Sequence, residues 1–194
     1  MKWMVFPALF VVASSVLGCE EGLQLGATSQ GTLAYQAHPN APSAMELAAK
    51  PCKYGDVARC IEQCQAGDPK ACNSMGVQFE YGHSTSPDST IASGFYARAC
   101  DANYAQGCTN LAWLYSLGRG VPHDTQQAML LFTRAFDASR LACRRGDGHG
   151  CLMAGEFMLR GDITPKDEDG AVAMFKLACD QGDPQGCEYV DTLR

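Results

Sequence analysis

Between residues 51 and 194, apolar residues recur at spacings of three and four, and glycines interrupt the pattern at regular intervals. When the chain is aligned on Cys72, Cys108 and Cys151, apolar or small residues recur three, four and seven places later, and again at twenty, twenty-four and twenty-seven. Glycine stands at the tenth place and aspartate at the sixteenth. Apolar residues three and four apart indicate amphipathic helices, glycine is typical of a helix end and aspartate of a helix start. Each unit is therefore predicted to be a pair of helices, and the fold to be all-α.

The cysteines fall into five pairs, each with its two members eight positions apart. Eight residues of one helix rise about 12 Å, whereas a disulfide needs Cα atoms within about 7 Å, so a turn must separate the two members. Four of the five intervening segments contain Gly-Asp, which ends one helix and caps the next, and the remaining one has Asn103. Zinc ligands favour gaps of two to four residues, so we expect no metal. The expected disulfides are Cys52–Cys60, Cys64–Cys72, Cys100–Cys108, Cys143–Cys151 and Cys179–Cys187.

One interval between cysteine pairs is longer than the others. From Cys64 onwards the pairs recur 36 residues apart, except that Cys100 and Cys143 are 43 apart, and the extra seven residues fall around 136–142. Seven residues are nearly two helical turns, so we predict a second helix in the middle repeat that is two turns longer than its counterparts. The expected units are a stub at 51–71, repeats at 72–107, 108–150 and 151–186, and a C-terminal cap at 187–194. Short helices near 56–65 and 185–194 are expected to close the two ends.

The first eighteen residues resemble an export signal, because Lys2 precedes a short apolar run that is too short to span a bilayer as a helix. The end of this segment, Val16-Leu17-Gly18-Cys19, is similar to a bacterial lipobox, which predicts acylation of Cys19. A plain secretory signal is the alternative. Residues 19–50 are interpreted as a flexible tether with a short helix at 44–49. The even number of remaining cysteines agrees with export, and Glu20 favours the outer membrane, facing the periplasm or the cell surface.

The segment LAWLYSLGRGVPHDTQQAMLLFTRA, with Gly118-Arg119-Gly120-Val121 and Asp124, resembles a Sel1-like repeat, a relative of the tetratricopeptide repeat. With its cysteine pairs, the chain from Cys52 to Arg194 resembles the cysteine-rich Sel1-like family, known chiefly as the Helicobacter cysteine-rich proteins. This resemblance implies a right-handed α/α solenoid of helical hairpins. The first and third repeats depart from the Gly-x-Gly-Val pattern in their loops.

Members of that family have been labelled β-lactamases or penicillin-binding proteins, and the residues needed for such chemistry are absent from the sequence. Serine enzymes of that kind need lysine three places after the serine, and no serine here has one. His-x-His, His-Glu-x-x-His, Lys-Thr-Gly and Gly-x-Ser-x-Gly are also absent. The histidines are expected in the tether (His38) and in loops (His83, His123 and His149). No catalytic residue, metal or cofactor is therefore predicted, and weak β-lactam binding or hydrolysis remains the second hypothesis.

The first hypothesis is a protein-binding or peptide-binding scaffold, with a cell-wall ligand as the alternative partner. The net charge of −6 argues against nucleic acid, and we expect a monomer whose only membrane contact is the lipid. Stacked helical hairpins present a curved surface to extended partners. If the first helices line its concave side, Tyr81 and Trp113 are the aromatic anchors, unless both pack between repeats. The expected surface is Ser74, Val77, Tyr81, Asn110, Trp113, Leu117, Met153, Glu156 and Arg160.

Overall fold

The computed structural model describes residues 52–53, 55–83 and 85–193. The predicted signal peptide (1–18), the lipidation site Cys19, and the tether (19–50) with its short helix at 44–49 lie outside the described residues, as does His38. These predictions are untested by the structure.

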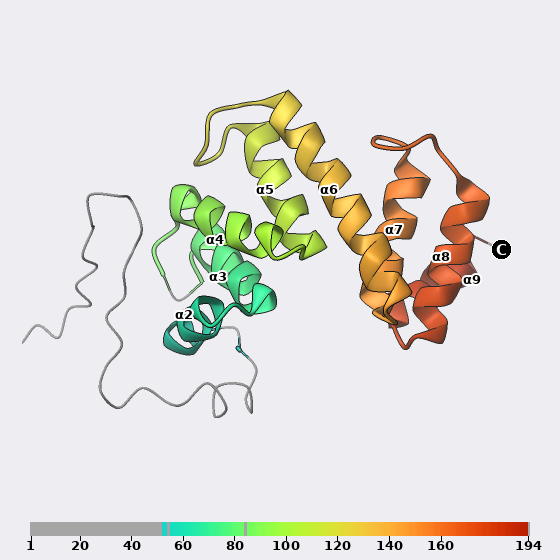
Figure 1. The fold of residues 1–194 in the computed structure, drawn as a ribbon, viewed down its shortest axis with the longest axis horizontal. Helices are drawn as coiled ribbons and strands as arrows, with labels where there is room; N and C mark the ends of the chain where they lie inside the picture. Colours follow the sequence, from blue (N-terminus) through green and yellow to red (C-terminus); the bar gives the residue numbers. More distant parts are fainter. Residues whose placement is uncertain (1–51, 54, 84, 194) are drawn as a thin grey trace, which may run out of the picture. The chain divides into compact units, whose positions relative to one another are not determined.

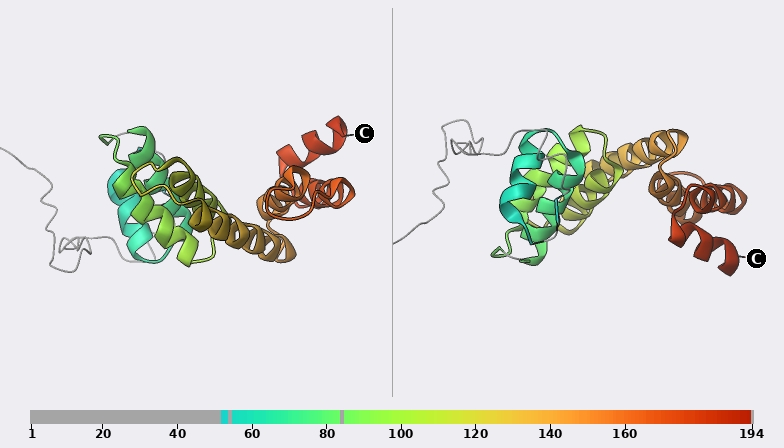
Figure 2. Two further views of the ribbon diagram at one scale, coloured as in Figure 1. Left: turned by 90° about the horizontal axis from the view of Figure 1, so that it is seen from above. Right: turned by 90° about the horizontal axis from the view of Figure 1, so that it is seen from below.

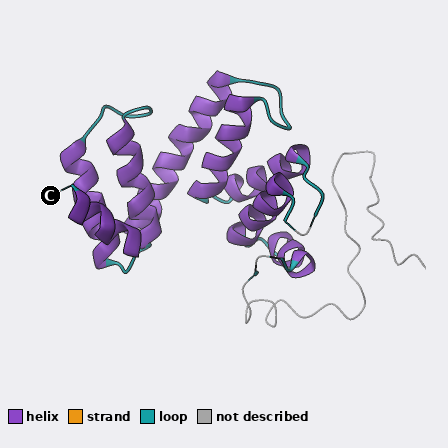
Figure 3. Cartoon of the chain, turned by 180° about the vertical axis from the view of Figure 1, so that it is seen from behind, coloured by secondary structure: helices purple, strands orange, loops and turns teal. Residues whose placement is uncertain are grey.

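The described residues form eight α-helices and no strand, which confirms the all-α fold (Figures 1 and 3). Each helix packs against the next one along the chain, so α3 with α4, α5 with α6, and α7 with α8 make three stacked hairpins. Two shorter helices, α2 and α9, pack at the two ends of this stack. The helices are α2 (Val57–Gln65), α3 (Pro69–Tyr81), α4 (Ser89–Asp101), α5 (Ala105–Leu117), α6 (Thr125–Arg144), α7 (Gly148–Arg160), α8 (Glu168–Asp180) and α9 (Pro184–Thr192).

The capping pattern predicted from the sequence is present at both ends of the first helices. Glycine in the left-handed conformation ends each of them, at Gly82, Gly118 and Gly161. Aspartate side chains accept hydrogen bonds from the first-turn amides of every helix from α2 to α9 except α5. Helix α5 follows Asn103, whose φ of 59° places it in the left-handed conformation, as its position in the repeat predicted.

All five disulfides have the predicted pairing. Four of them join the end of one helix to the start of the next across a tight turn, and Cys52–Cys60 joins the segment before α2 to α2 itself. The Cα atoms of each pair are 4.4–4.9 Å apart. The closed loops are short, so the chain-entropy model gives about 2–3 kcal/mol for each bridge. These bridges supplement a core that is divided among several small clusters of buried side chains.

Small residues let the two helices of a hairpin approach closely. A Cβ atom at Gly76 would overlap the Tyr96 ring, and one at Gly155 would overlap the ring of Phe175. Tyr96 and Phe175 are fully buried, so the two aromatic rings fill the space that the glycines leave. This is the physical reason for glycine at these places in the first and third repeats.

The second helix of the middle repeat is two turns longer than its counterparts, as predicted. Helix α6 has 20 residues, whereas α4 and α8 have 13 each. Figure 2 shows α6, in gold, as the long helix between the helices that precede it, in green, and those that follow it, in orange and red. Its neighbours α5 and α7 have 13 residues each, so neither covers its full length.

Candidate functional site

A pocket lies where α7 stops short of the first turns of α6. Helix α7 begins against the end of α6, since a Cβ atom at Gly150 would meet Ala142 and Cys143. Helix α7 has 13 residues against the 20 of α6, and its Phe157 ring contacts Phe132 and Phe136 of α6. The hollow beside the uncovered turns has a volume of about 170 Å³. It is lined by Trp113 of α5, Met129 and Phe132 of α6, Phe157 and Arg160 of α7, and Asp162 and Ile163 of the following loop.

Three aromatic rings, those of Trp113, Phe132 and Phe157, line this pocket, which we call the Trp113 pocket. The rings of Trp113 and Phe132 meet edge to face, with centroids 5.2 Å apart. Phe157 makes similar contacts with Phe132 at 6.5 Å and with Phe136 at 5.9 Å. Phe157 is 2% exposed and belongs to the core, whereas Trp113 is 46% exposed. The walls are therefore held by packing, while part of the indole stays open to solvent.

The charged groups at the rim of the Trp113 pocket balance each other. The guanidinium of Arg160 lies over the Phe157 ring, 5.0 Å from its centroid, and its Nε is 3.7 Å from an Asp162 carboxylate oxygen. Both side chains are partly exposed, so the pair contributes little to stability. The pocket therefore presents an apolar interior beside a rim with no net charge.

The structure brings two of the nine predicted surface residues, Trp113 and Arg160, together in this pocket. Tyr81 and Leu117 are 60% and 58% exposed at the ends of α3 and α5. Ser74, Val77, Asn110 and Glu156 are half-buried.

Two of the nine have roles inside the fold that the sequence did not reveal. Asn110 donates a hydrogen bond of 2.9 Å to the side chain of Asn73 in the preceding repeat. Met153 differs from the prediction, since it is 6% exposed. It lies in the core because α7 packs that side against the long α6, so it is not part of the surface.

The sequence did not reveal the other pocket residues, because Phe132 and Phe157 follow the ordinary core pattern. The sequence of α6 does contain one indication of a binding surface. Met129 and Leu130 stand where the first repeat has Ser93 and Gly94, and they are 44% and 62% exposed. The fold therefore does not need large apolar residues at these places. Four of the seven exposed large apolar side chains among the described residues belong to the middle repeat: Trp113, Leu117, Met129 and Leu130.

A polar network around the nearly buried Glu80 side chain joins the first two repeats. The Tyr96 hydroxyl donates a 2.8 Å hydrogen bond to Glu80, and Arg119 of the next repeat pairs with the other Glu80 oxygen at 3.1 Å. The Glu80 side chain is 9% exposed, so this ion pair is better shielded than those at the surface. Burial, the hydrogen bond and the Glu80 charge raise the pKa of Tyr96 well above its usual value.

Polar contacts also connect the last repeats. The Tyr189 hydroxyl donates to Glu156 at 3.4 Å, and the charge of Glu156 raises the pKa of Tyr189. His149 lies within α7 rather than in a loop, because Asp147 caps that helix two residues earlier. Its ring nitrogens are 3.3 Å from Gln106 and 3.5 Å from Asp183. These contacts indicate a structural role for His149 between repeats.

Among the residues that the structure describes, no group of three or more His, Cys, Asp and Glu side chains is arranged to hold a metal ion. Over the same residues, none of the helices has the length and apolar character that crossing a membrane requires.

The family model of the Sel1 repeat matches residues 69–104, 105–139 and 148–183, which together are more than half of the chain. The chain belongs to the Sel1-repeat family. Two curated relatives, cytochrome c oxidase assembly factor 7 of Xenopus tropicalis and factor 7A of Xenopus laevis, are 29% identical to it over 126 residues. These matches cover 62% of this chain and 52% of each relative, so the chain spans about half the length of the curated relatives it matches.

Three solved structures are similar to the chain at low sequence identity. A Sel1-repeat protein from Oxalobacter formigenes is 19% identical, with a TM-score of 0.49, over 75% of this chain and 57% of that one. A protective antigen with an SLR fold, present in uropathogenic Escherichia coli strains, is 20% identical with a TM-score of 0.48. The match covers 71% of this chain and 28% of the antigen. Helicobacter pylori cysteine rich protein B is 23% identical with a TM-score of 0.46. The match covers 74% of this chain and 94% of that protein.

Proposed function

We propose that this Sel1-repeat protein is a scaffold that binds a protein or peptide partner through the middle repeat, with the Trp113 pocket as its anchor site. One observation carries the proposal, which is the half-exposed indole at the mouth of an aromatic pocket of about 170 Å³. Small-molecule sites usually have volumes of about 300–1,000 Å³. The Trp113 pocket is below that range and suits a single large side chain of a partner.

The chemistry of the pocket favours a neutral apolar occupant. Its interior is formed by aromatic, Met and Ile side chains, and Arg160 is already paired with Asp162 at the rim. A charged occupant would lose its hydration without gaining an unpaired counter-ion. A leucine, isoleucine, phenylalanine or tryptophan side chain on an extended peptide satisfies these conditions.

The pocket gives no support to the β-lactam hypothesis. None of its seven lining residues is a serine, cysteine, lysine or histidine, so none offers the hydroxyl or thiol nucleophile of acyl-transfer chemistry. Its one carboxylate, Asp162, is paired with Arg160. The curated relatives are named as assembly factors for cytochrome c oxidase, a description of action on other proteins. Both points favour binding as the activity of this chain, with a protein partner preferred over a cell-wall ligand.

The site of action proposed here is the bacterial cell envelope, with Cys19 acylated and the protein facing the periplasm or the surface. Five disulfides support an oxidising compartment, and the lipobox-like segment supports the anchor. Labelled palmitate should enter the wild-type protein expressed in a bacterial host, and Cys19→Ala should take up none. Equal labelling of both proteins would refute the anchor and leave the scaffold untouched.

Selection from a random peptide library displayed on phage tests the scaffold. The bait is the oxidised full chain, and the selected peptides are then titrated against Trp113→Ala and the control Tyr81→Ala. Tyr81 is also an exposed aromatic residue, and it is not among the lining residues of the pocket. We expect a large apolar residue to be enriched at one position, and binding to weaken about tenfold or more in Trp113→Ala alone. No enrichment, or equal binding to all three proteins, would refute the Trp113 pocket as the anchor.

A further inference from the structure

The Trp113 pocket contains one exposed thioether, that of Met129, which is 44% exposed. The other methionines in the described part of the chain are buried or half-buried: Met75, Met153, Met158 and Met174. All ten cysteines of the same part are held in disulfides. Among the described residues, Met129 therefore carries the sulfur group that is most accessible to an oxidant.

The repeat does not require methionine at position 129. The equivalent positions hold Ser93 in the first repeat and Val172 in the third, and both are half-buried. In the middle repeat, Met129 lines the pocket together with Trp113 and Ile163. The thioether therefore belongs to the surface that the pocket presents to a partner, and not to the buried core of the fold.

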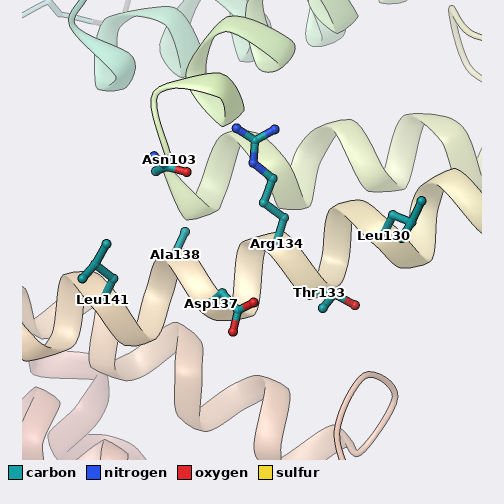
Figure 4. A pocket seen from close by; sticks show the side chains of 7 residues that line it. All are labelled: Asn103, Leu130, Thr133, Arg134, Asp137, Ala138 and Leu141. Carbon is teal, nitrogen blue, oxygen red and sulfur yellow. The ribbon is translucent and has the colours of Figure 1, made fainter.

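Leu130, the next residue along α6, lines a different hollow. That hollow has a volume of about 360 Å³ and lies between α6 and the turn that carries Asn103 (Figure 4). Its lining residues and those of the Trp113 pocket have no member in common. Leu130 is 62% exposed, so a thioether placed there would meet the same oxidant without lining the pocket. The two neighbouring positions thus provide a matched control.

We propose that Met129 is an oxidation site that controls the affinity of the Trp113 pocket for its partner, an inference that rests on the proposed function of that pocket. The reactant is a two-electron oxidant of the peroxide class. One oxygen atom passes from hydrogen peroxide to the thioether sulfur as the O–O bond breaks, so the sulfur loses two electrons and the peroxide is reduced to water. The product is methionine sulfoxide, whose oxygen is a hydrogen-bond acceptor in place of an apolar thioether.

The sulfoxide opposes the apolar occupant that the pocket suits. Water hydrates the sulfoxide oxygen while the pocket is open, and an apolar partner side chain removes that water without donating a hydrogen bond. Arg160 is the one cation in the lining, and its Nε is already 3.7 Å from a carboxylate oxygen of Asp162. Oxidation therefore weakens partner binding and leaves the fold intact, because Met129 is exposed.

The test compares the disulfide-bonded full chain with two variants, each before and after treatment with dilute hydrogen peroxide. The first variant is Met129→Leu. The second combines Met129→Leu with Leu130→Met, which moves the thioether one residue along α6 and out of the pocket lining. All three proteins carry Trp3→Phe, so that tryptophan emission reports on Trp113 alone.

Four measurements are made on each protein. Peptide mass spectrometry locates every sulfoxide, melting temperatures report folding, and Trp113 emission is recorded without peptide. A peptide selected from the random library is then titrated to give the affinity. Each protein is compared only with itself before peroxide, so any effect of the substitutions on affinity cancels.

In the protein that retains Met129, we expect sulfoxide to form there before it forms at the other described methionines. Trp113 emission should change without peptide, and affinity for the peptide should fall about tenfold. The melting temperature should stay the same. Both variants should keep their own affinity and emission after peroxide, although residue 130 of the second variant becomes oxidised.

Sulfoxide at a buried methionine before Met129, or an equal loss of affinity in the variant with Leu130→Met, would overturn the proposal. Peptide binding that survives complete oxidation of Met129 would refute this proposal alone and leave the function of the pocket standing. Absence of peptide binding before peroxide is added would refute the function of the pocket, and this proposal with it. The two failures are therefore distinguishable.

Discussion

The indole of Trp113 meets the ring of Phe132 edge to face, with centroids 5.2 Å apart, and still leaves 46% of its surface exposed. Trp113 therefore both packs against the neighbouring helix and exposes part of its ring to solvent, the two alternatives that its place in the repeat allowed. An aromatic pair of this kind contributes about 0.5–1.5 kcal/mol beyond buried area. The rest of the indole is available to a partner.

Replacement of Trp113 by Ala should lower the free energy of unfolding by about 1–2 kcal/mol, because one edge-to-face pair and part of its buried area are lost. Leu114→Ala is the control for a core position, since Leu114 is 1% exposed. That variant should lose about 2–5 kcal/mol. Chemical denaturation of both variants measures the difference. Equal losses would place Trp113 in the core.

Deletion of residues 136–142 should shorten α6 to the length of α4 and α8 while keeping the fold. The deletion joins Ala135 to Cys143, which restores the Ala-Cys pair that the first repeat has at Ala99 and Cys100. Helix α7 would then reach the first turns of α6 and cover the Trp113 pocket. We expect five disulfides by mass spectrometry, a helical circular dichroism spectrum and loss of peptide binding. A folded deletion variant that still binds would contradict this account of the pocket.

Gly120→Ala should destabilise the protein by about 2 kcal/mol, because Gly120 has a φ of 70° and an added Cβ would overlap the backbone of Ser89. Gly94→Ala is the matched control. Gly94 lies in α4 with open space around it, so alanine there should stabilise the protein by about 0.5–1 kcal/mol. Thermal melts of the two variants should shift in opposite directions. A shift of the same sign in both would be inconsistent with the packing of this loop on α4.

Because of Tyr96, the free energy of unfolding should fall as the pH rises into the alkaline range. The folded state raises the pKa of Tyr96 above the value of about 10 expected in the unfolded chain. As the pH rises above about 10, the unfolded state loses the tyrosine proton first, so stability falls. Tyr96→Phe removes this proton, so its free energy of unfolding should fall less with rising pH. The comparison runs from pH 9 to 11, about one unit on either side of the unfolded-state pKa of tyrosine. Parallel curves for the two proteins would show that Tyr96 does not contribute.

The repeat fold could be predicted from the sequence because its rules are local. The eight-residue spacing of the cysteines needs a turn, Gly-Asp supplies one, and Asn103 takes the glycine position in a left-handed conformation. The longer α6 followed from seven residues inserted between Cys100 and Cys143. Each of these features depends on neighbours within one or two helical turns.

The candidate site could be predicted only in part, because it depends on where helices end relative to one another. Trp113 and Arg160 were predicted to share a face, but the spacing did not show that α7 stops beside Met129. Met153 has the same place in its repeat as Asn110 and is buried, since the long α6 packs against that part of α7. The position of the end of α7 and the burial of Met153 both depend on contacts between repeats of unequal length.

Fluorescence of Trp113 tests the central claim most directly. The chain has two tryptophans, Trp3 and Trp113, so a full chain with Trp3→Phe reports on the pocket alone. It is titrated with a peptide selected from the random library, and a second titration uses the same peptide with its apolar anchor changed to Ala. The account predicts a saturable change in Trp113 emission with the first peptide and none with the second. Tight binding of the first peptide with unchanged Trp113 emission would contradict it.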